Sequence, residues 1–213
     1  MQQKKSKKIL IYFFLFLMIG TINNKNLNIS NFTKLNEIII TGLDEKNNEQ
    51  MINNLSFLKL DNFFFLDEQK IKEVIDLNNL VEEYSVFRKY PSTLKIEIDQ
   101  TEFLAVTIKN ENNFFLGSNG KLIEVIESRK DLPFIFGNFS IENFFRLKKA
   151  VDESNFEYTE IKNFFFFKSG RWDIETNSGL LIKLPQKNIK KSLQLMISFL
   201  EKENDKKISE IDL

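Results

Sequence analysis

The stretch Val86-Phe87-Arg88-Lys89-Tyr90-Pro91-Ser92-Thr93-Leu94-Lys95-Ile96 decides the fold of this chain. Apolar residues alternate with polar ones on both sides of its Tyr-Pro pair, at Tyr84, Val86, Leu94, Ile96 and Ile98. This period of two is typical of strands with one buried face, and Tyr-Pro-Ser favours a turn between them. The stretch therefore predicts a β-hairpin in which Tyr90 and Pro91 are structural rather than binding residues.

The residues before this hairpin predict one strand and two helices. Ile38 to Ile40 form a short apolar run that ends at Thr41-Gly42, as expected for a strand. Helical spacing of apolar residues follows, at Met51, Ile52, Leu55 and Leu58. Asp67 can then cap a second helix that carries Ile71, Val74 and Ile75. The predicted order over residues 37–101 is strand, helix, helix, strand, strand.

Residues 102–213 predict a second, mainly antiparallel β domain with two helices. Asn119-Gly120 suits the tight turn of a hairpin, and Ser140 can cap a helix. We expect strands at 158–167, 171–175 and 180–184, then a helix from Ile189 to Leu200 and a last strand from Ile208 to Leu213. The sequence thus predicts the α+β class.

The N-terminus has the pattern of a membrane segment. Four lysines lie within residues 1–8, and residues 9–22 are almost entirely apolar. We expect a cytoplasmic tail (1–8), a single transmembrane helix (9–22) and a linker (23–36), because no small-residue cleavage pattern follows the apolar run. A cleaved signal peptide remains the alternative, since fourteen helical residues span only about 21 Å.

Composition argues against several classes of function. The chain has 30 Lys plus Arg, 30 Asp plus Glu, no His and no Cys, so imidazole and thiol chemistry and the commonest zinc sites are excluded. Without excess positive charge, nucleic-acid binding is not expected. The runs 63–65 and 164–167 of phenylalanine are interpreted as strand core. The sequence therefore predicts no catalytic residue, no cofactor and no metal.

The hairpin stretch resembles the POTRA domain of the bacterial cell-division family FtsQ/DivIB. The resemblance extends to residues 39–42 and 62–67, and further along the chain to Leu132-Pro133, residues 170–173 and residues 179–185. It makes Gly42, Arg88, Tyr90 and Pro91 structural motif positions. Relatives usually continue beyond the segment that ends here at Leu213.

The resemblance implies a non-enzymatic scaffold of the division machinery. Its expected partners are the FtsB and FtsL ectodomains, with further contacts to FtsK, FtsW and the septal synthase. Its expected place is the inner membrane at the septum, crossed once, with the N-terminus cytoplasmic and the bulk periplasmic. The expected partner-binding residues are Arg171, Ile208, Ile211 and Leu213, with Val86 as a second candidate. Two alternatives stay open, namely a membrane-anchored peptidoglycan hydrolase and another POTRA-containing envelope assembly factor.

Overall fold

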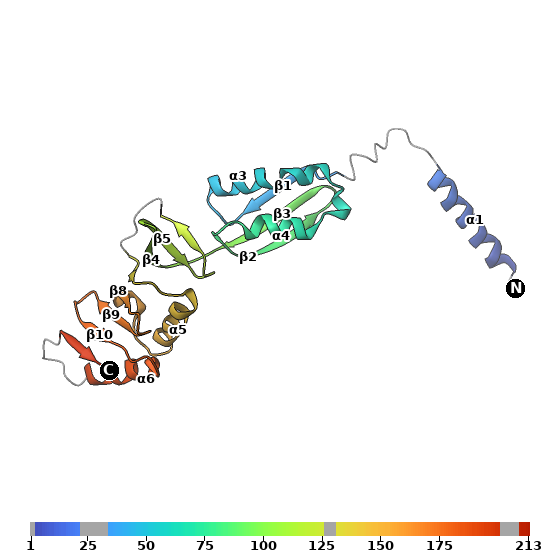
Figure 1. Cartoon of the computed structure of the whole chain (residues 1–213). Coiled ribbons are helices and arrows are strands. Elements are labelled where there is room, and N and C mark those ends of the chain that lie inside the picture. The colour runs from blue at the N-terminus through green and yellow to red at the C-terminus, as the bar shows by residue number, and fades with distance from the viewer. Residues whose placement is uncertain (1–2, 22–33, 126–130, 201–208) are drawn as a thin grey trace.

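The computed structural model describes residues 3–21, 34–125, 131–200 and 209–213 (Figure 1). An N-terminal helix, α1 (Gln3–Thr21), precedes two folded units. The N-terminal unit runs from β1 to β3 and the C-terminal unit from β4 to β11. The fold is α+β, as predicted.

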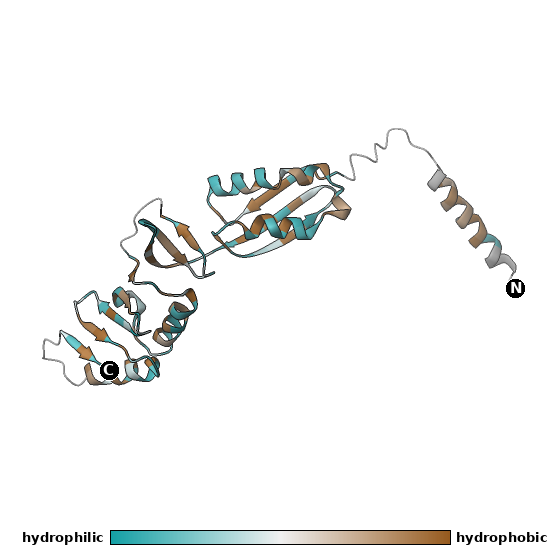
Figure 2. Ribbon diagram, viewed as in Figure 1, coloured by the Kyte–Doolittle hydropathy of each residue, from teal (hydrophilic) through white to brown (hydrophobic). Residues whose placement is uncertain are grey.

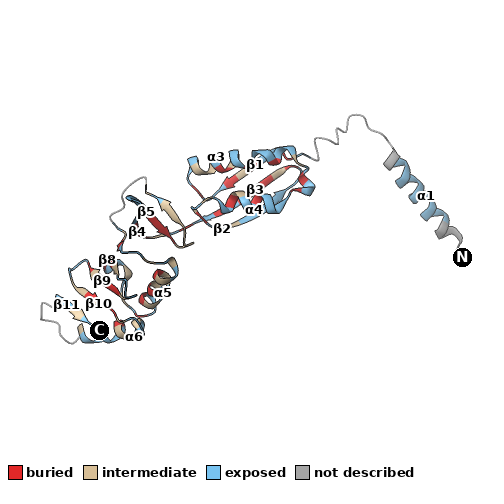
Figure 3. Cartoon of the chain, in the orientation of Figure 1, coloured by how far each residue is buried: buried red, intermediate tan, exposed pale blue. Residues whose placement is uncertain are grey.

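The N-terminal unit has the predicted element order, with two short 3-10 helices between its α-helices. The elements are β1 (Glu37–Thr41), α3 (Glu45–Asn54), η1 (Ser56–Leu60), η2 (Phe63–Phe65), α4 (Glu68–Asp76), β2 (Val81–Lys89) and β3 (Thr93–Gln100). β3 lies between β1, which is parallel to it, and the antiparallel β2. Both helices bury their apolar stripes against this sheet, as the red inner faces in Figure 3 show. The predicted cap is confirmed, because the Asp67 carboxylate accepts bonds from the amides of Gln69 and Lys70.

The C-terminal unit is built on one eight-stranded sheet of order β11-β10-β9-β8-β7-β4-β5-β6. Its elements are β4 (Phe103–Lys109), β5 (Asn112–Gly117), β6 (Leu122–Glu124), β7 (Phe134–Phe136), α5 (Ile141–Asp152), η3 (Tyr158–Glu160), β8 (Ile161–Phe166), β9 (Trp172–Thr176), β10 (Leu181–Lys183), α6 (Ile189–Leu200) and β11 (Glu210–Asp212). The helices α5 and α6 pack on one face of the sheet, and Phe144, Leu147 and Leu193 are fully buried there. The predicted cap of α5 is confirmed, since the Ser140 hydroxyl accepts a bond from the Asn143 amide.

The sheet is mainly antiparallel, as predicted, with four antiparallel pairs of neighbouring strands, but its parallel pairs were not predicted. Three of the seven neighbouring strand pairs are parallel: β4 with β7, β7 with β8, and β10 with β11. A parallel pair requires a crossover connection, and a helix usually provides it. Here α5 carries the chain from β7 to β8, and α6 carries it from β10 towards β11. The two helices are therefore crossovers rather than additions to a meander.

The predicted transmembrane helix is wrong. Of the helices in the described ranges, none combines the length and the apolar character that crossing a membrane requires. The reason lies in α1, whose first turns hold the four lysines and leave the apolar part, coloured brown in Figure 2, too short. Thirteen residues from Ile9 to Thr21 rise only about 20 Å, against about 30 Å of hydrocarbon.

One aromatic run also differs from its prediction. Phe63 to Phe65 form the 3-10 helix η2 instead of a strand. Only Phe63 is buried, and the rings of Phe64 and Phe65 are exposed. The second run lies largely on β8 as expected, with Phe164 fully buried.

Candidate functional site

The strand β11 forms one end of the eight-stranded sheet, next to β10. It pairs in parallel with β10, with Glu210 opposite Leu181 and Asp212 opposite Lys183. The Leu181 amide donates to the Ser209 carbonyl, and the Leu213 amide donates to the Lys183 carbonyl, each at 3.0 Å. β11 is thus an edge strand within the described residues.

The direction of these bonds fixes which backbone groups of β11 face outward. Peptide groups alternate in direction along a strand, so Ser209, Ile211 and Leu213 point their backbone groups towards β10. The amides and carbonyls of Glu210 and Asp212 therefore point away from the sheet. An extended segment of another chain can use such an unpaired edge for hydrogen bonding.

The side chains of Ile211 and Leu213, which were predicted to bind partners, point towards the core and not outward from the edge. Ile211 and Leu213 are half-buried and pack against the helix-covered core of the C-terminal unit. Ile208 lies outside the described residues. The side chains of Ile211 and Leu213 hold β11 on the core. The part of this edge that remains available to a partner is therefore its outward-facing backbone.

Arg171 has a partner within the chain. Its Nη2 donates to Asp173 Oδ2 at 3.2 Å, and its Nε forms an ion pair with Asp173 Oδ1 at 3.0 Å. The guanidinium also lies over the ring of Phe167, 5.0 Å from the centroid. The Asp173 side chain is buried, whereas 38% of the Arg171 side chain is exposed. Arg171 is therefore held in place but can still be reached from solvent.

The charges near the edge form a row across three strands. The register places Asp173 of β9, Lys183 of β10 and Asp212 of β11 side by side. Burial raises the pKa of Asp173, while the neighbouring Arg171 and Lys183 act in the opposite direction. A hydrogen bond to Glu210 raises the pKa of Lys183. The row therefore runs from the buried carboxylate of Asp173 on β9 to the exposed carboxylate of Asp212 on the free edge.

A second edge lies in the N-terminal unit. β2 is at the end of the sheet order β1-β3-β2, and Val86 is exposed on it. Arg88 pairs with Glu68 of α4 at 3.0 Å, so it ties β2 to that helix. The other three motif residues lie near β3. A cis peptide bond joins Tyr90 to Pro91 just before this strand, and Gly42 lies against the Ile98 carbonyl within it.

A polar clamp that the sequence did not reveal joins the two units. The Asn119 side chain donates to the carbonyls of Asn79 and Val81, at 2.9 and 2.8 Å. Lys121 Nζ donates to the carbonyl of Asp76 at 2.7 Å, at the end of α4, where a cation is favourable. Asn79 in turn donates to the Leu122 carbonyl at 2.9 Å. Asn119-Gly120 was predicted as a turn, and nothing local to it indicates which surface the turn contacts.

Glu82 and Glu83 are neighbouring acids near the start of β2. A β-bulge between Val81 and Glu83 interrupts the register, and both glutamates line one shallow hollow together with Asp76. Glu82 accepts hydrogen bonds from Thr101 and Ser118, at 2.9 and 2.7 Å. Glu82 thus belongs to the junction between the units. Among the described residues, no three His, Cys, Asp or Glu side chains gather as a metal site would require.

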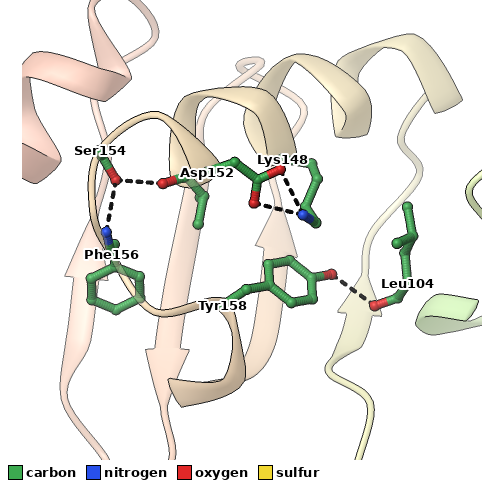
Figure 4. Close-up of polar contacts among 7 residues, drawn as sticks. Leu104, Lys148, Asp152, Ser154, Phe156 and Tyr158 are labelled. Atoms are coloured by element: carbon green, nitrogen blue, oxygen red, sulfur yellow. Dashed lines mark hydrogen bonds and ion pairs between the residues drawn. The ribbon is translucent and has the colours of Figure 1, made fainter.

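Tyr158 is the most strongly perturbed titratable group in the C-terminal unit (Figure 4). Burial raises its pKa far above the ordinary value. Its hydroxyl donates to the Leu104 carbonyl at 2.7 Å, and Lys148, which pairs with Asp152, lies over its ring. A phenol that stays protonated and donates to backbone has a structural role, here joining η3 to β4.

Two family models match this chain. Residues 33–99 match the FtsQ-type POTRA domain. Residues 105–213 match the C-terminal part of cell division protein FtsQ/DivIB. The chain belongs to the FtsQ/DivIB family. The curated members of this family described below are cell division proteins.

Two curated FtsQ proteins are similar to this chain. The FtsQ of Rickettsia bellii (strain RML369-C) is 26% identical over 164 residues, which are 76% of this chain and 61% of that protein. The FtsQ of Bradyrhizobium diazoefficiens is 22% identical over 176 residues, which are 80% of this chain and 50% of that protein. The matched part thus spans about half to three fifths of the length of these relatives.

A solved structure of the same family is also similar. It is the major extracytoplasmic domain of the division protein DivIB from Geobacillus stearothermophilus, in its trans isomer. The TM-score is 0.37 at 12% identity, and the match covers 50% of this chain and 96% of that domain.

Proposed function

We propose that this FtsQ/DivIB protein is a non-enzymatic scaffold that binds other division proteins through its exposed sheet edges. The observation that carries the proposal is the β11 edge, where the backbone groups of Glu210 and Asp212 point away from the sheet. Added strands gain affinity from main-chain hydrogen bonds and selectivity from neighbouring side chains. The family suggests FtsB and FtsL ectodomains as partners, with FtsK, FtsW and the septal synthase as further ones.

The surroundings of the edge support a selective contact. Arg171 directly precedes β9, two strands away from β11, and 38% of its side chain is exposed. An acidic side chain of an FtsB-like helix that lies across these strands could share its guanidinium with Asp173. The β2 edge around Val86 is the second candidate surface. We place the protein at the division septum, with its folded units on the periplasmic side.

A substitution at Asp212 tests the edge. The Asp212 amide points outward, so Asp212→Pro removes one donor from the free edge and leaves the bonds to β10 intact. We expect Asp212→Pro to bind a soluble FtsB-like ectodomain several-fold more weakly than wild type, because one net hydrogen bond is worth about 0.5 to 1.5 kcal/mol. Titration calorimetry with the purified full chain measures this difference.

Two matched variants make the result specific. Asp212→Ala removes the same charge but keeps the amide, so it should bind more tightly than Asp212→Pro. Arg171→Gln should weaken binding because the partner reaches the exposed part of the guanidinium, and since the variant also removes the cation beside the buried Asp173, its thermal unfolding is measured in parallel to confirm that it is folded at the titration temperature. Equal affinities in wild type, Asp212→Pro and Arg171→Gln would contradict the β11 proposal and favour the β2 edge around Val86.

A further inference from the structure

The N-terminal unit carries a cluster of exposed apolar side chains at one end, which we name the aromatic pole. The largest exposed fractions are 85% for Leu60, 82% for Phe65 and 73% for Tyr90, and Phe57 and Phe64 are also exposed. Single exposed apolar residues are common on proteins, but a contiguous group of this kind usually marks an interaction surface.

Several contacts bring Phe64 and Tyr90, and the backbone segments that carry the other exposed side chains, to the same end of the unit although they come from separate parts of the chain. The ring of Tyr90 lies 5.7 Å from Phe63 and 6.1 Å from Phe64. Lys34 forms a β-bridge with Asn62, and the Asn36 amide donates to the Ser92 carbonyl at 2.9 Å. The pole therefore gathers the start of the N-terminal unit, η2 and the β2–β3 turn. Figure 1 shows this end of the unit facing away from the C-terminal unit.

Local structure holds the exposed rings outward. Within η2 only Phe63 points into the core, where it is fully buried. The Asn62 side chain accepts a bond from the Phe64 amide at 3.0 Å, which fixes the start of this short helix. The two following rings are consequently presented to solvent by a well-defined turn, and the core does not need them.

The charges around the pole are more positive than those of the rest of the folded chain. Lys34, Lys59 and Lys89 are exposed at its rim, against the acids Glu37 and Asp61. The remaining charges nearby are paired, Arg88 with Glu68 at 3.0 Å and Lys70 with Asp67 at 4.0 Å. From residue 26 onward the sequence has 25 cations and 30 anions, so the net positive rim differs in sign from this part of the chain as a whole.

The pole also lies where the chain arrives from α1. The apolar side chains of α1 from Ile9 to Ile19 are all exposed (Figure 3). Twelve residues separate Thr21 from Lys34, so the two apolar surfaces lie within about 45 Å of chain length. This length of chain allows the aromatic pole and the apolar side chains of α1 to contact the same extended apolar surface.

We propose that the aromatic pole docks on the surface of a lipid bilayer. Tyrosine and phenylalanine rings are well suited to the headgroup region, and lysines beside them attract anionic lipids by about 1 kcal/mol each, or about fivefold in partitioning. Phe64, Phe65 and Tyr90 enter the interface, and Lys59 and Lys89 contact the headgroups. This contact sets the orientation of the N-terminal unit on the membrane surface, and it does not depend on the β11 proposal.

The natural absence of cysteine gives a clean test. In the full chain, Leu60→Cys carries an environment-sensitive dye at the pole, and Leu77→Cys carries it just after the C-terminal end of α4, near the junction with the C-terminal unit. The two leucines are matched, with exposed fractions of 85% and 83%. With phosphatidylglycerol vesicles we expect a blue shift, and quenching by brominated acyl chains, at position 60 and not at position 77.

Further variants and conditions decide the nature of the contact. Lys59→Gln with Lys89→Gln should reduce the inserted fraction at position 60 about fivefold for each lysine, in phosphatidylglycerol but not in phosphatidylcholine vesicles. Phe64→Ser with Phe65→Ser should remove the shift in both. Identical spectra at positions 60 and 77 overturn the proposal. A shift without vesicles that grows with protein concentration also overturns it, since a second copy would then cover the pole.

Discussion

At the scale of single residues, the motif positions have different roles that the sequence pattern alone did not separate. Tyr90 and Pro91 were predicted to be structural because Tyr-Pro-Ser favours a turn, and the turn is present between β2 and β3. Tyr90 is nevertheless 73% exposed, so its packing contributes less to stability than a buried ring would. The motif predicted the turn, but not how deeply each of its side chains lies, because depth depends on η2 from another part of the chain.

Gly42 is the motif residue at which the structure leaves no room for a side chain. Its φ angle is +112°, and a Cβ atom there would lie 1.7 Å from the Ile98 carbonyl oxygen. We predict that Gly42→Ala lowers the free energy of unfolding by about 3 to 5 kcal/mol, the sum of backbone strain and a forced shift of β3. Urea denaturation measures this loss.

Gly179 provides the control for this prediction. It also has a positive φ, of +86°, but a Cβ atom there would meet nothing within 4 Å. Gly179→Ala should therefore cost only the backbone strain, about 1 to 2 kcal/mol. Similar losses in both variants would mean that the contact with Ile98 is not the cause.

At the scale of helices and strands, periodicity predicted local elements well and their pairing less well. Asp67 and Ser140 begin their helices where the sequence placed them, because a cap is a local interaction. The strands β4 and β7 were not predicted, and β7 has only three residues. Whether a strand pairs in parallel depends on where its crossover helix returns it, which no local pattern encodes.

The row of charges across β9, β10 and β11 predicts a measurable pH dependence. Burial raises the pKa of Asp173, so the folded state binds a proton more tightly than the unfolded state does. Stability then falls as pH rises from the ordinary value of 3.8 through the raised pKa. We predict that Asp173→Asn removes this slope, so wild type gains stability relative to the variant on acidification towards pH 3.8.

Glu175, also on β9, is the matched control with the opposite sign. A hydrogen bond from Asn163 lowers its pKa, so its contribution to stability is present above the ordinary value of 4.5 and is lost as pH falls through the lowered pKa. Wild type should lose stability relative to Glu175→Gln on acidification. Chemical denaturation at a series of pH values measures both differences, and slopes of the same sign in the two variants would refute the assignment.

At the scale of the whole molecule, the residues that the structure describes form two separate apolar cores. One core lies between α3, α4 and the three-stranded sheet, and the other between α5, α6 and the eight-stranded sheet. Composition and periodicity predicted both units. The polar clamp between them was not predicted. Asn79, Asn119 and Lys121 have the composition typical of turns, and their contacts join residues about 40 positions apart in the sequence, which no local pattern indicates.

The clamp predicts that the two units unfold together. Asn119 makes two of the bonds across the junction and Lys121 supplies a cation to the end of α4, so the clamp couples the two units through polar contacts. Trp172 is the only tryptophan of the chain, and its fluorescence reports the C-terminal unit alone. In wild type its unfolding transition should coincide with the loss of amide protection in α4.

Removing the clamp should separate these transitions. Asn119→Ala with Lys121→Ala removes at least three hydrogen bonds between the units, a loss of about 1.5 to 4.5 kcal/mol in coupling. We expect amide protection in α4 to be lost at lower denaturant than the Trp172 transition. Asn177→Ala is the control, because Asn177 donates its side-chain bond to Thr159 within one unit and should leave the two probes coincident. If the two probes still coincide in the double variant, the units are coupled by something other than the clamp.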